Sequence, residues 1–187
     1  MSEQAPRTTS KLERRRFLKR GLVGGAALVL AGNLPFLLRS TRVRFAPRGQ
    51  LRLLTHEEHA ILAAVVARLC PGAHAGPDWP TADALDCAGK IDALMAQVHP
   101  DVGKDFRRLL RLLESSYLGT FMAFSPRPFT RADGDEQDRR LEAWRRSRFT
   151  LPRSGYQAVK RLAHATYYSS PEVYPRIGYP GPPVVPG

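Results

Sequence analysis

The feature that most limits what this chain can fold into is its N-terminal end, where a basic motif leads into a long apolar run at residues 22–38. The motif consists of Arg14, Arg15, Phe17, Leu18 and Lys19. Paired arginines followed by two apolar residues and a lysine are typical of a twin-arginine export signal, which a receptor reads and which joins no folded core. An amphipathic or transmembrane helix over 12–30 is the alternative, but three glycines there weaken it by roughly 1 kcal/mol each.

This signal predicts a periplasmic protein. Small residues at 29–31 could mark a cleavage site, yet the apolar run continues past them to Leu38. An uncleaved signal segment would associate the protein with the inner membrane. Because twin-arginine substrates typically cross the membrane folded, such a protein either carries a cofactor or travels bound to a partner that does.

Charge and composition divide the chain into three parts: a signal and apolar segment at 1–40, a basic linker at 41–54, and a single helical domain with a docking tail at 55–187. Residues 1–54 hold 12 Lys and Arg against 2 acids, whereas residues 55–187 hold 17 against 15. The basicity therefore belongs to the leader and linker, and it argues against a nucleic-acid partner. The linker arginines could contact anionic lipid or simply be solvated.

Helical spacing of apolar residues recurs throughout the third part, and no stretch alternates long enough to indicate a strand. Thr55 and Glu58 form a capping box that predicts a helix start. The helices predicted in this way span residues 55–69, 81–98, 101–118, 136–147 and 155–168. We therefore expect an all-α domain of about four to five helices, preceded by the signal helix.

Two cysteines, Cys70 and Cys87, flank a segment rich in glycine and proline. In an oxidising compartment such a pair predicts an intrachain disulfide, worth roughly 3 kcal/mol by loop entropy. A free buried thiol and a bridge to a partner chain are the alternatives.

The sequence shows no clear set of catalytic, metal-ligating or cofactor-binding residues. His56 and His59 share a helix face, but no third ligand has matching spacing. The aspartates at 133, 135 and 138 lack the rest of a calcium loop and fit a turn before a helix. No nucleotide cradle or haem-attachment motif is present in the sequence. We therefore expect no catalytic residue, cofactor or metal in this chain.

The tail, residues 169–187, is rich in proline and predicted to be extended. Its tyrosines, isoleucine and prolines offer contact area at low entropic cost, which favours docking on a partner. Packing of the tail back on the helices of its own chain is the alternative. The predicted docking residues are Tyr174, Ile177, Tyr179, Pro180 and Pro182.

Three segments carry a family resemblance: Leu54-Thr55-His56-Glu57-Glu58, then Leu69-Cys70-Pro71-Gly72-Ala73, and finally residues 167–182, which run from Tyr-Tyr-Ser to Gly-Tyr-Pro-Gly-Pro. Together with the leader they resemble the gluconate 2-dehydrogenase subunit 3 family.

The resemblance implies a non-catalytic small subunit of a periplasmic dehydrogenase complex. Its large subunit would be an FAD-containing flavoprotein of the glucose-methanol-choline type that oxidises a sugar, sugar acid or alcohol. A third subunit could be a cytochrome with haem c. The small subunit would stabilise the flavoprotein and take it through the twin-arginine translocase. A stand-alone membrane-anchored periplasmic binding module, or an enzyme of unknown substrate, is the alternative.

Overall fold

The structure is a computed structural model that describes residues 46–115 and 127–182. Within these ranges the chain forms five α-helices and three short 3₁₀ helices, and no residue is in a strand, which confirms the all-α prediction. The α-helices are α2 (His56–Leu69), α3 (Cys87–Met95), α4 (Pro100–Glu114), α6 (Gly134–Arg145) and α7 (Thr150–Tyr168). The 3₁₀ helices are η1 (Pro71–Ala73), η2 (Phe129–Arg131) and η3 (Pro171–Ile177). The predicted signal lies outside the described residues.

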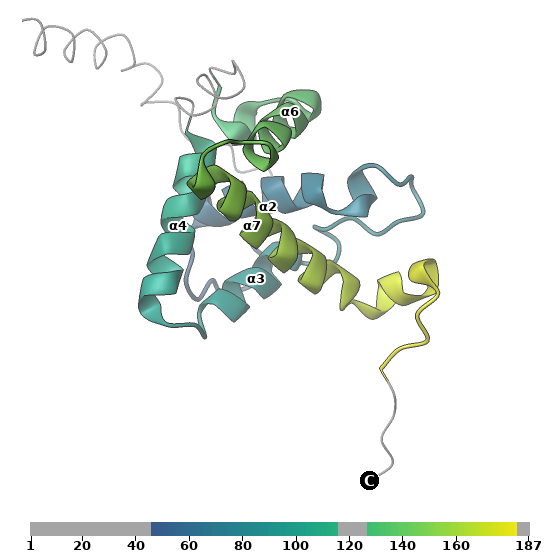
Figure 1. Cartoon of the computed structure of the whole chain (residues 1–187). Helices are drawn as coiled ribbons and strands as arrows, with labels where there is room; N and C mark the ends of the chain where they lie inside the picture. The colour runs from purple at the N-terminus through teal and green to yellow at the C-terminus, as the bar shows by residue number, and fades with distance from the viewer. Residues whose placement is uncertain (1–45, 116–126, 183–187) are drawn as a thin grey trace, which may run out of the picture. The chain divides into compact units, whose positions relative to one another are not determined.

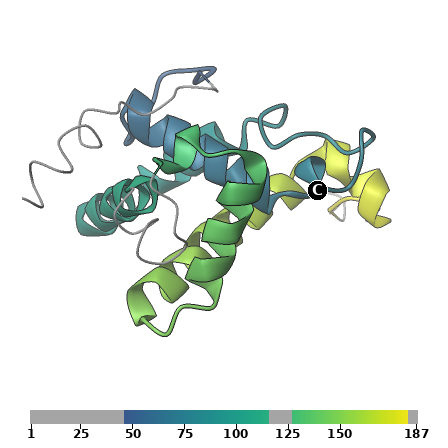
Figure 2. The same ribbon diagram turned by 90° about the horizontal axis from the view of Figure 1, so that it is seen from above.

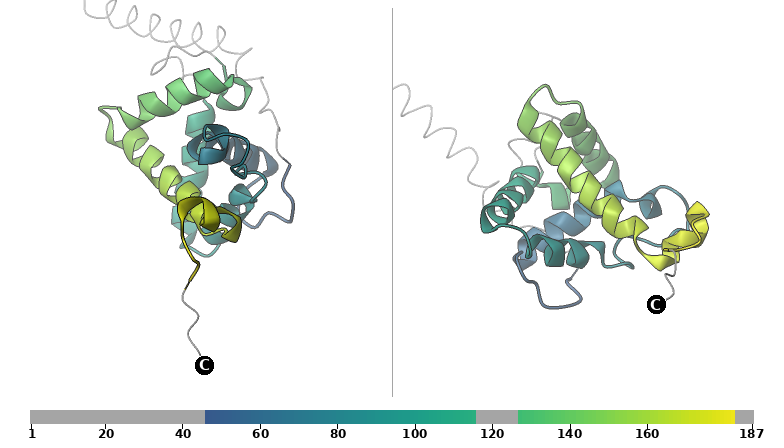
Figure 3. Two further views of the ribbon diagram at one scale, coloured as in Figure 1. Left: turned by 90° about the vertical axis from the view of Figure 1, so that its right-hand side faces the viewer. Right: turned by 60° about the horizontal axis from the view of Figure 1, so that its bottom comes forward.

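Helix α2 is the centre of the domain. Its residues from Glu58 to Val66 are all buried, and it contacts α3, α4, α6 and α7, which lie around it in Figures 1 and 3. A helix covered on every side must be apolar or small on every side, and the alanines at 60, 63 and 64 provide this. The large apolar residues Ile61, Leu62, Val65 and Val66 are therefore only part of a fully enclosed helix.

The capping box at the start of α2 is confirmed. The Glu58 amide donates to the Thr55 hydroxyl at 3.2 Å, and the Thr55 amide donates to the Glu58 carboxylate at 3.0 Å. The helix ends at Leu69, with Cys70 as its C-cap and Pro71 opening η1. Proline cannot continue an α-helix, so the chain turns here as predicted.

Helix α3 is shorter than predicted, beginning at Cys87 rather than near residue 81. Residues 82–86 form turns, and Asp86 before the helix has a φ of 50°, in the left-handed region. Aspartate tolerates this conformation better than most residues, but a continuous helix cannot pass through it. The helical spacing of Leu85 and Ile91 therefore spans a break.

Helix α4 begins one residue earlier than the predicted cap. The His99 ring accepts the Asp101 amide at 3.3 Å, so His99 is the N-cap and Pro100 occupies the first turn. Proline is favoured there because its missing N–H has no partner to lose. Phe106, Leu110 and Leu113 are buried. The predicted continuation to residue 118 lies outside the described residues.

Helices α6 and α7 are joined by a short turn at the edge of the domain (Figures 2 and 3). Asp133 caps α6 by accepting the Glu136 amide at 2.9 Å, which accounts for the acidic cluster as a helix start. Arg68 of α2 forms a two-point ion pair with Asp138 of α6. Helix α7 begins at Thr150, five residues before its predicted start, because Pro152 lies in its first turn, where proline is tolerated.

The tail begins as a 3₁₀ helix and not as the predicted extended segment. In η3, Val173 is completely buried and packs into the core, and η3 contacts α7. Burial of this one valine explains the difference, because it folds the chain back on its own domain. Residues 183–187 lie outside the described residues.

The predicted disulfide is absent, since Cys70 and Cys87 are both free, buried thiols. The Cys70 thiol lies 3.8 Å from the Ala163 carbonyl of α7, and the Cys87 thiol interacts with the Thr166 hydroxyl one turn further along. Each sulfur therefore has its own contact on α7 inside the core. The structure matches the free-thiol alternative.

Candidate partner-docking site

The C-terminal segment is fixed to the domain where it leaves α7. The Ser170 hydroxyl accepts a hydrogen bond from the Lys90 ammonium of α3 at 2.9 Å and donates to the Thr166 carbonyl at 3.2 Å. At the end of α7, the Tyr167 hydroxyl donates to the Pro80 carbonyl at 2.7 Å. These contacts bring α3, α7 and the loop before α3 together beneath the segment.

Beyond Ser170 the chain folds into a compact, ordered segment. The Tyr174 hydroxyl donates to the Ser169 carbonyl at 3.0 Å. Gly178 has a φ of 65°, which glycine adopts without strain, and this reversal lets the Tyr179 amide reach the Tyr174 carbonyl at 3.0 Å. The rings of Tyr174 and Tyr179 then meet edge to face, with centroids 5.0 Å apart. The segment is therefore ordered before it meets any partner.

This packing separates the predicted docking residues into two kinds. Tyr174 is half-buried and packs on Tyr179, whereas Ile177 and Tyr179 are 45% and 42% exposed. Pro180 and Pro182 are also exposed. Ile177 and Tyr179 thus form an apolar surface that is held in place by Val173 and Tyr174.

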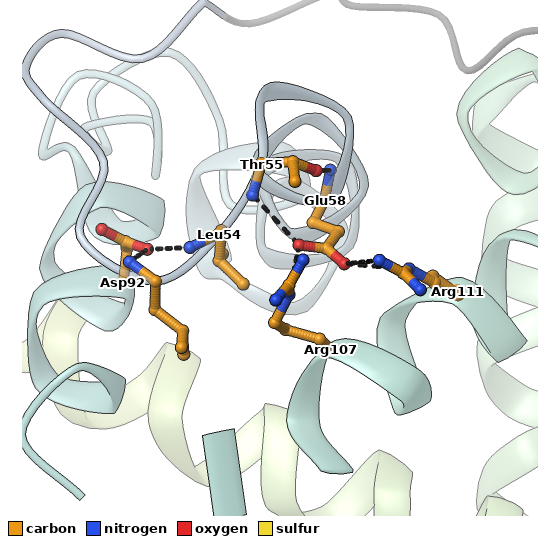
Figure 4. A network of polar contacts seen from close by, with 7 residues as sticks. Leu54, Thr55, Glu58, Asp92, Arg107 and Arg111 are labelled. Atoms are coloured by element: carbon orange, nitrogen blue, oxygen red, sulfur yellow. Dashed lines mark hydrogen bonds and ion pairs between the residues drawn. The ribbon is translucent and has the colours of Figure 1, made fainter. Parts of the chain in front are cut away.

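A second feature is the arm, residues 46–54, which precedes α2. The buried carboxylate of Asp92 accepts three consecutive backbone amides of this arm, and Figure 4 shows the contact with Leu54. The Arg52 amide lies at 2.6 Å, the Leu53 amide at 3.1 Å and the Leu54 amide at 2.7 Å. Charge-assisted hydrogen bonds of this kind are among the stronger ones in proteins. The end of the linker is thus attached to α3.

Glu58 continues the same row of contacts (Figure 4). Besides the Thr55 amide, its buried carboxylate accepts the Arg107 Nε at 2.8 Å and the Arg111 Nε at 2.9 Å, both from α4. Burial would raise the pKa of Glu58, but the Thr55 hydrogen bond and the two guanidiniums together hold the pKa below its ordinary value of 4.5. Four consecutive amides, from Arg52 to Thr55, are therefore bound by two carboxylates.

Two polar hollows border these carboxylates. One, of about 700 Å³, lies between the arm and α3 and includes Asp86 and Asp92 in its wall. The other, of about 540 Å³, lies beside the start of α2 and includes Glu58 and Arg111. The Asp92 carboxylate is used by backbone amides, and the Glu58 carboxylate by a backbone amide and two guanidiniums, which makes both of them structural groups.

The two histidines of α2 do not form a metal site. Within residues 46–115 and 127–182, no three His, Cys, Asp or Glu side chains are placed to hold a metal ion. His59 is buried, and its ring nitrogens have no hydrogen-bond partner among the described residues. Burial lowers its pKa, so its ring is neutral at pH 7. No helix within residues 46–115 and 127–182 is long and apolar enough to cross a membrane.

Sequence reasoning missed Asp92, Lys90, Arg107 and Arg111 as members of this site. Each of these residues bonds to a partner far away in the sequence. The separation is at least 38 residues for Asp92, 80 for Lys90, 49 for Arg107 and 53 for Arg111. The one available signal was Asp92 beside Ile91, a charged residue next to the apolar face of a predicted helix.

Comparison with known protein families places most of this chain in one of them. The family model described as gluconate 2-dehydrogenase subunit 3 matches residues 56–181. Neither the curated proteins nor the solved structures contain a significant match. The matched range begins at the first residue of α2 and ends within the exposed C-terminal segment.

Proposed function

This chain belongs to the gluconate 2-dehydrogenase subunit 3 family, and from that membership we propose that it is the non-catalytic small subunit of a periplasmic, flavin-dependent dehydrogenase complex. The family implies a dehydrogenase complex with a larger catalytic subunit. We propose that this larger subunit is an FAD-containing flavoprotein that oxidises a sugar, sugar acid or alcohol. A cytochrome carrying haem c is proposed as the electron-accepting third subunit.

The observation that carries this proposal is the extent of the match. It covers α2, α3, α4, α6, α7 and η3, so the whole described helical domain corresponds to the family and not merely one motif. The roles assigned to Asp92 and Glu58 agree with a scaffold subunit, because both carboxylates hold the chain itself together.

The export role rests on the N-terminal sequence. Arg14 and Arg15 with the apolar run at 22–38 would address this subunit to the twin-arginine translocase. A flavoprotein without its own signal would cross the membrane bound to it. The complex would then work in the periplasm, at the inner membrane if the signal segment remains attached.

Export is tested by exchanging both motif arginines for lysine. Arg14→Lys with Arg15→Lys keeps the charge but removes the guanidinium pair, so both this subunit and its flavoprotein should remain in the cytoplasm. Cell fractionation followed by measurement of periplasmic flavin reports the outcome. Arg7→Lys with Arg20→Lys is the matched control and should leave export unchanged. Normal periplasmic flavoprotein in the motif variant would rule out the carrier role.

Docking is tested by separating the exposed and buried residues of the C-terminal segment. Ile177→Ala with Tyr179→Ala should weaken recovery of the flavoprotein in a pull-down while leaving the melting temperature nearly unchanged, because neither side chain is in the core. Leu94→Ala with Val102→Ala removes comparably exposed side chains, 47% and 51%, elsewhere on the domain and should have no effect. Val173→Ala should instead lower the melting temperature. Full recovery of the partner by the tail variant would show that docking uses another surface.

A further inference from the structure

The net positive charge of the described domain is concentrated in one stretch. Residues 46–115 carry 8 Lys and Arg against 9 Asp and Glu, whereas residues 127–182 carry 11 against 6. Between Glu142 and Glu172 the sequence has no acidic residue. The basic residues of that interval are Arg145, Arg146, Arg148, Arg153, Lys160 and Arg161. The first four lie at the turn that joins α6 to α7.

Two large apolar side chains project from the same turn. Phe149 is 48% exposed and Leu151 is 61% exposed, the highest value for any large apolar residue among the described residues. Trp144 and Pro152, which flank them in the chain, are buried. At this turn Trp144 and Pro152 therefore lie in the core, whereas Phe149 and Leu151 face solvent.

Hydrogen bonds fix this conformation. The Ser147 hydroxyl accepts the Phe149 amide at 3.1 Å, and the Ser147 carbonyl accepts the Arg153 guanidinium at 3.1 Å. The Arg148 guanidinium lies 5.1 Å from the centre of the Phe149 ring, within the range of a cation–π contact. Phe149 and Leu151 are thus displayed by an ordered turn.

Only one carboxylate offsets the arginines on this turn. Glu142 pairs with Arg145 at 2.6 Å and also with Arg146. Residues 142–153 hold four arginines and this one acid, so the turn remains strongly positive. Figures 2 and 3 show it at the periphery of the domain, with no other described element lying beyond it.

A convex, basic turn with an apolar tip fits the surface of an anionic bilayer. Guanidiniums attract phosphate headgroups, and a few exposed apolar side chains enter the boundary between headgroups and acyl chains. A stable protein partner would bury about 800 Å² on each side around a desolvated apolar core, and two exposed apolar side chains offer little of such a core.

We propose that the α6–α7 turn is a membrane-contact surface that docks on anionic phospholipid, with Phe149 and Leu151 at the interface and Arg146 and Arg148 on the headgroups. This surface is separate from Ile177 and Tyr179, because α7 has 19 residues and so spans roughly 28 Å between them. The inference concerns the folded domain and does not depend on the export role.

A site-specific dye can test this in the full chain even if the N-terminal segment also binds lipid. Cys70 and Cys87 are buried, and burial raises the pKa of both thiols, so a cysteine introduced by Leu151→Cys can be labelled selectively with a polarity-sensitive maleimide dye. Val102→Cys, at a comparably exposed position on α4, is the matched control. Vesicles of phosphatidylglycerol should shift the emission of the dye at 151 to the blue, and spin-labelled lipid should quench it. The dye at 102 should show neither effect.

The charge requirement is tested in the same assay. Arg146→Gln with Arg148→Gln should weaken the apparent affinity that the dye at 151 reports roughly tenfold. Lys104→Gln with Arg108→Gln removes two exposed positive charges from α4 and should not change that affinity. Phosphatidylcholine vesicles and inorganic phosphate should leave the dye at 151 in an aqueous environment.

Four results would overturn the proposal: equal responses at 151 and 102, an unchanged response after loss of the two arginines, an equal response to phosphatidylcholine, or a response to phosphate alone. If polyglutamate shifts the dye at 151 and phosphatidylglycerol does not, the turn binds an acidic polypeptide and the lipid assignment is wrong.

Discussion

Glu58 shows how a single carboxylate can serve two helices at once. It caps α2 through the Thr55 amide and receives Arg107 and Arg111 from α4. Removing a buried charge that has several donors is costly, because each donor loses its partner. The negative charge at this position therefore helps to keep α2 and α4 together.

The low pKa of Glu58 makes its contribution dependent on pH. A carboxyl whose pKa is lower in the folded than in the unfolded chain stabilises the protein above its unfolded pKa, and that stability is lost as the pH falls through the folded value. Glu58→Gln should thus reduce the free energy of unfolding by about 1–3 kcal/mol at pH 7. The difference in free energy of unfolding between the variant and the native chain should narrow as the pH falls below 4.5, the ordinary pKa of a glutamate. Urea unfolding at pH 7 and at pH 3 measures both; a difference that does not narrow would contradict the role of ionised Glu58.

The cysteines give a second prediction at this scale. Burial raises the pKa of Cys70 to about 12 and also raises that of Cys87, so both thiols are protonated and inaccessible in the folded chain. A thiol reagent at pH 8 should react with neither cysteine in the native protein and with both in denaturant. Reaction that proceeds at the same rate in both conditions would show that the thiols are not buried.

Among the elements, η1 depends on a glycine. A Cβ at Gly72 would lie 2.4 Å from the Pro80 carbonyl oxygen and 2.9 Å from the Thr81 Cα, so the backbone on either side of the loop would have to separate. This close approach explains the glycine in the Cys-Pro-Gly-Ala segment, because any larger residue would clash with main chain.

Gly72→Ala should consequently destabilise the domain by about 1–3 kcal/mol, the usual cost of forcing extra volume into a packed site. Gly49→Ala is a suitable control, since a Cβ there meets no atom within 4 Å. Chemical denaturation of the two variants compares them directly. Equal stability would mean that the loop at Pro80 gives way without cost.

Helix positions were predicted best where local chemistry determines them. The Thr55 capping box and the stop at Pro71 are both found, because hydrogen bonds between neighbours and the geometry of proline need no tertiary partner. The start of α3 was wrong because the turn at Asp86 follows from backbone conformation, which apolar spacing does not reveal. The start of α7 was placed too late because Pro152 was compatible with either a loop or a first turn.

The candidate site was less predictable than the fold. The aromatic and proline content of the C-terminal segment indicated contact surface, but which residues face outward depends on Val173 entering a core assembled by α2, α3 and α7. Asp92 could not be assigned, because its three amide partners lie on a segment that has no regular period of its own.

At the scale of the whole domain, Asp92 joins the arm to the helices. Asp92→Asn keeps the shape but replaces one acceptor oxygen with a donor group that faces backbone amides. The arm should then detach readily, and trypsin should cleave after Arg52 roughly tenfold faster or more, given the worth of hydrogen bonds to a charged group. Asp101→Asn, an exposed control, should not change the rate. Unchanged cleavage in Asp92→Asn would mean that the arm is held by other contacts.

The row of amides from Arg52 to Thr55 also determines how the domain responds to mechanical load. Tension on the N-terminal side first loads the exposed contacts of Arg48 with Ala84 and Asp83, and then the consecutive hydrogen bonds to Asp92 and Glu58. Because these hydrogen bonds are loaded one after another and not together, they break in succession. In a single-molecule force experiment the arm would peel away at low force, and α2 would be loaded only after the bond to Glu58 has broken. The hydrogen bonds to Asp92 and Glu58 thus delay the point at which a pulling force reaches the helical core.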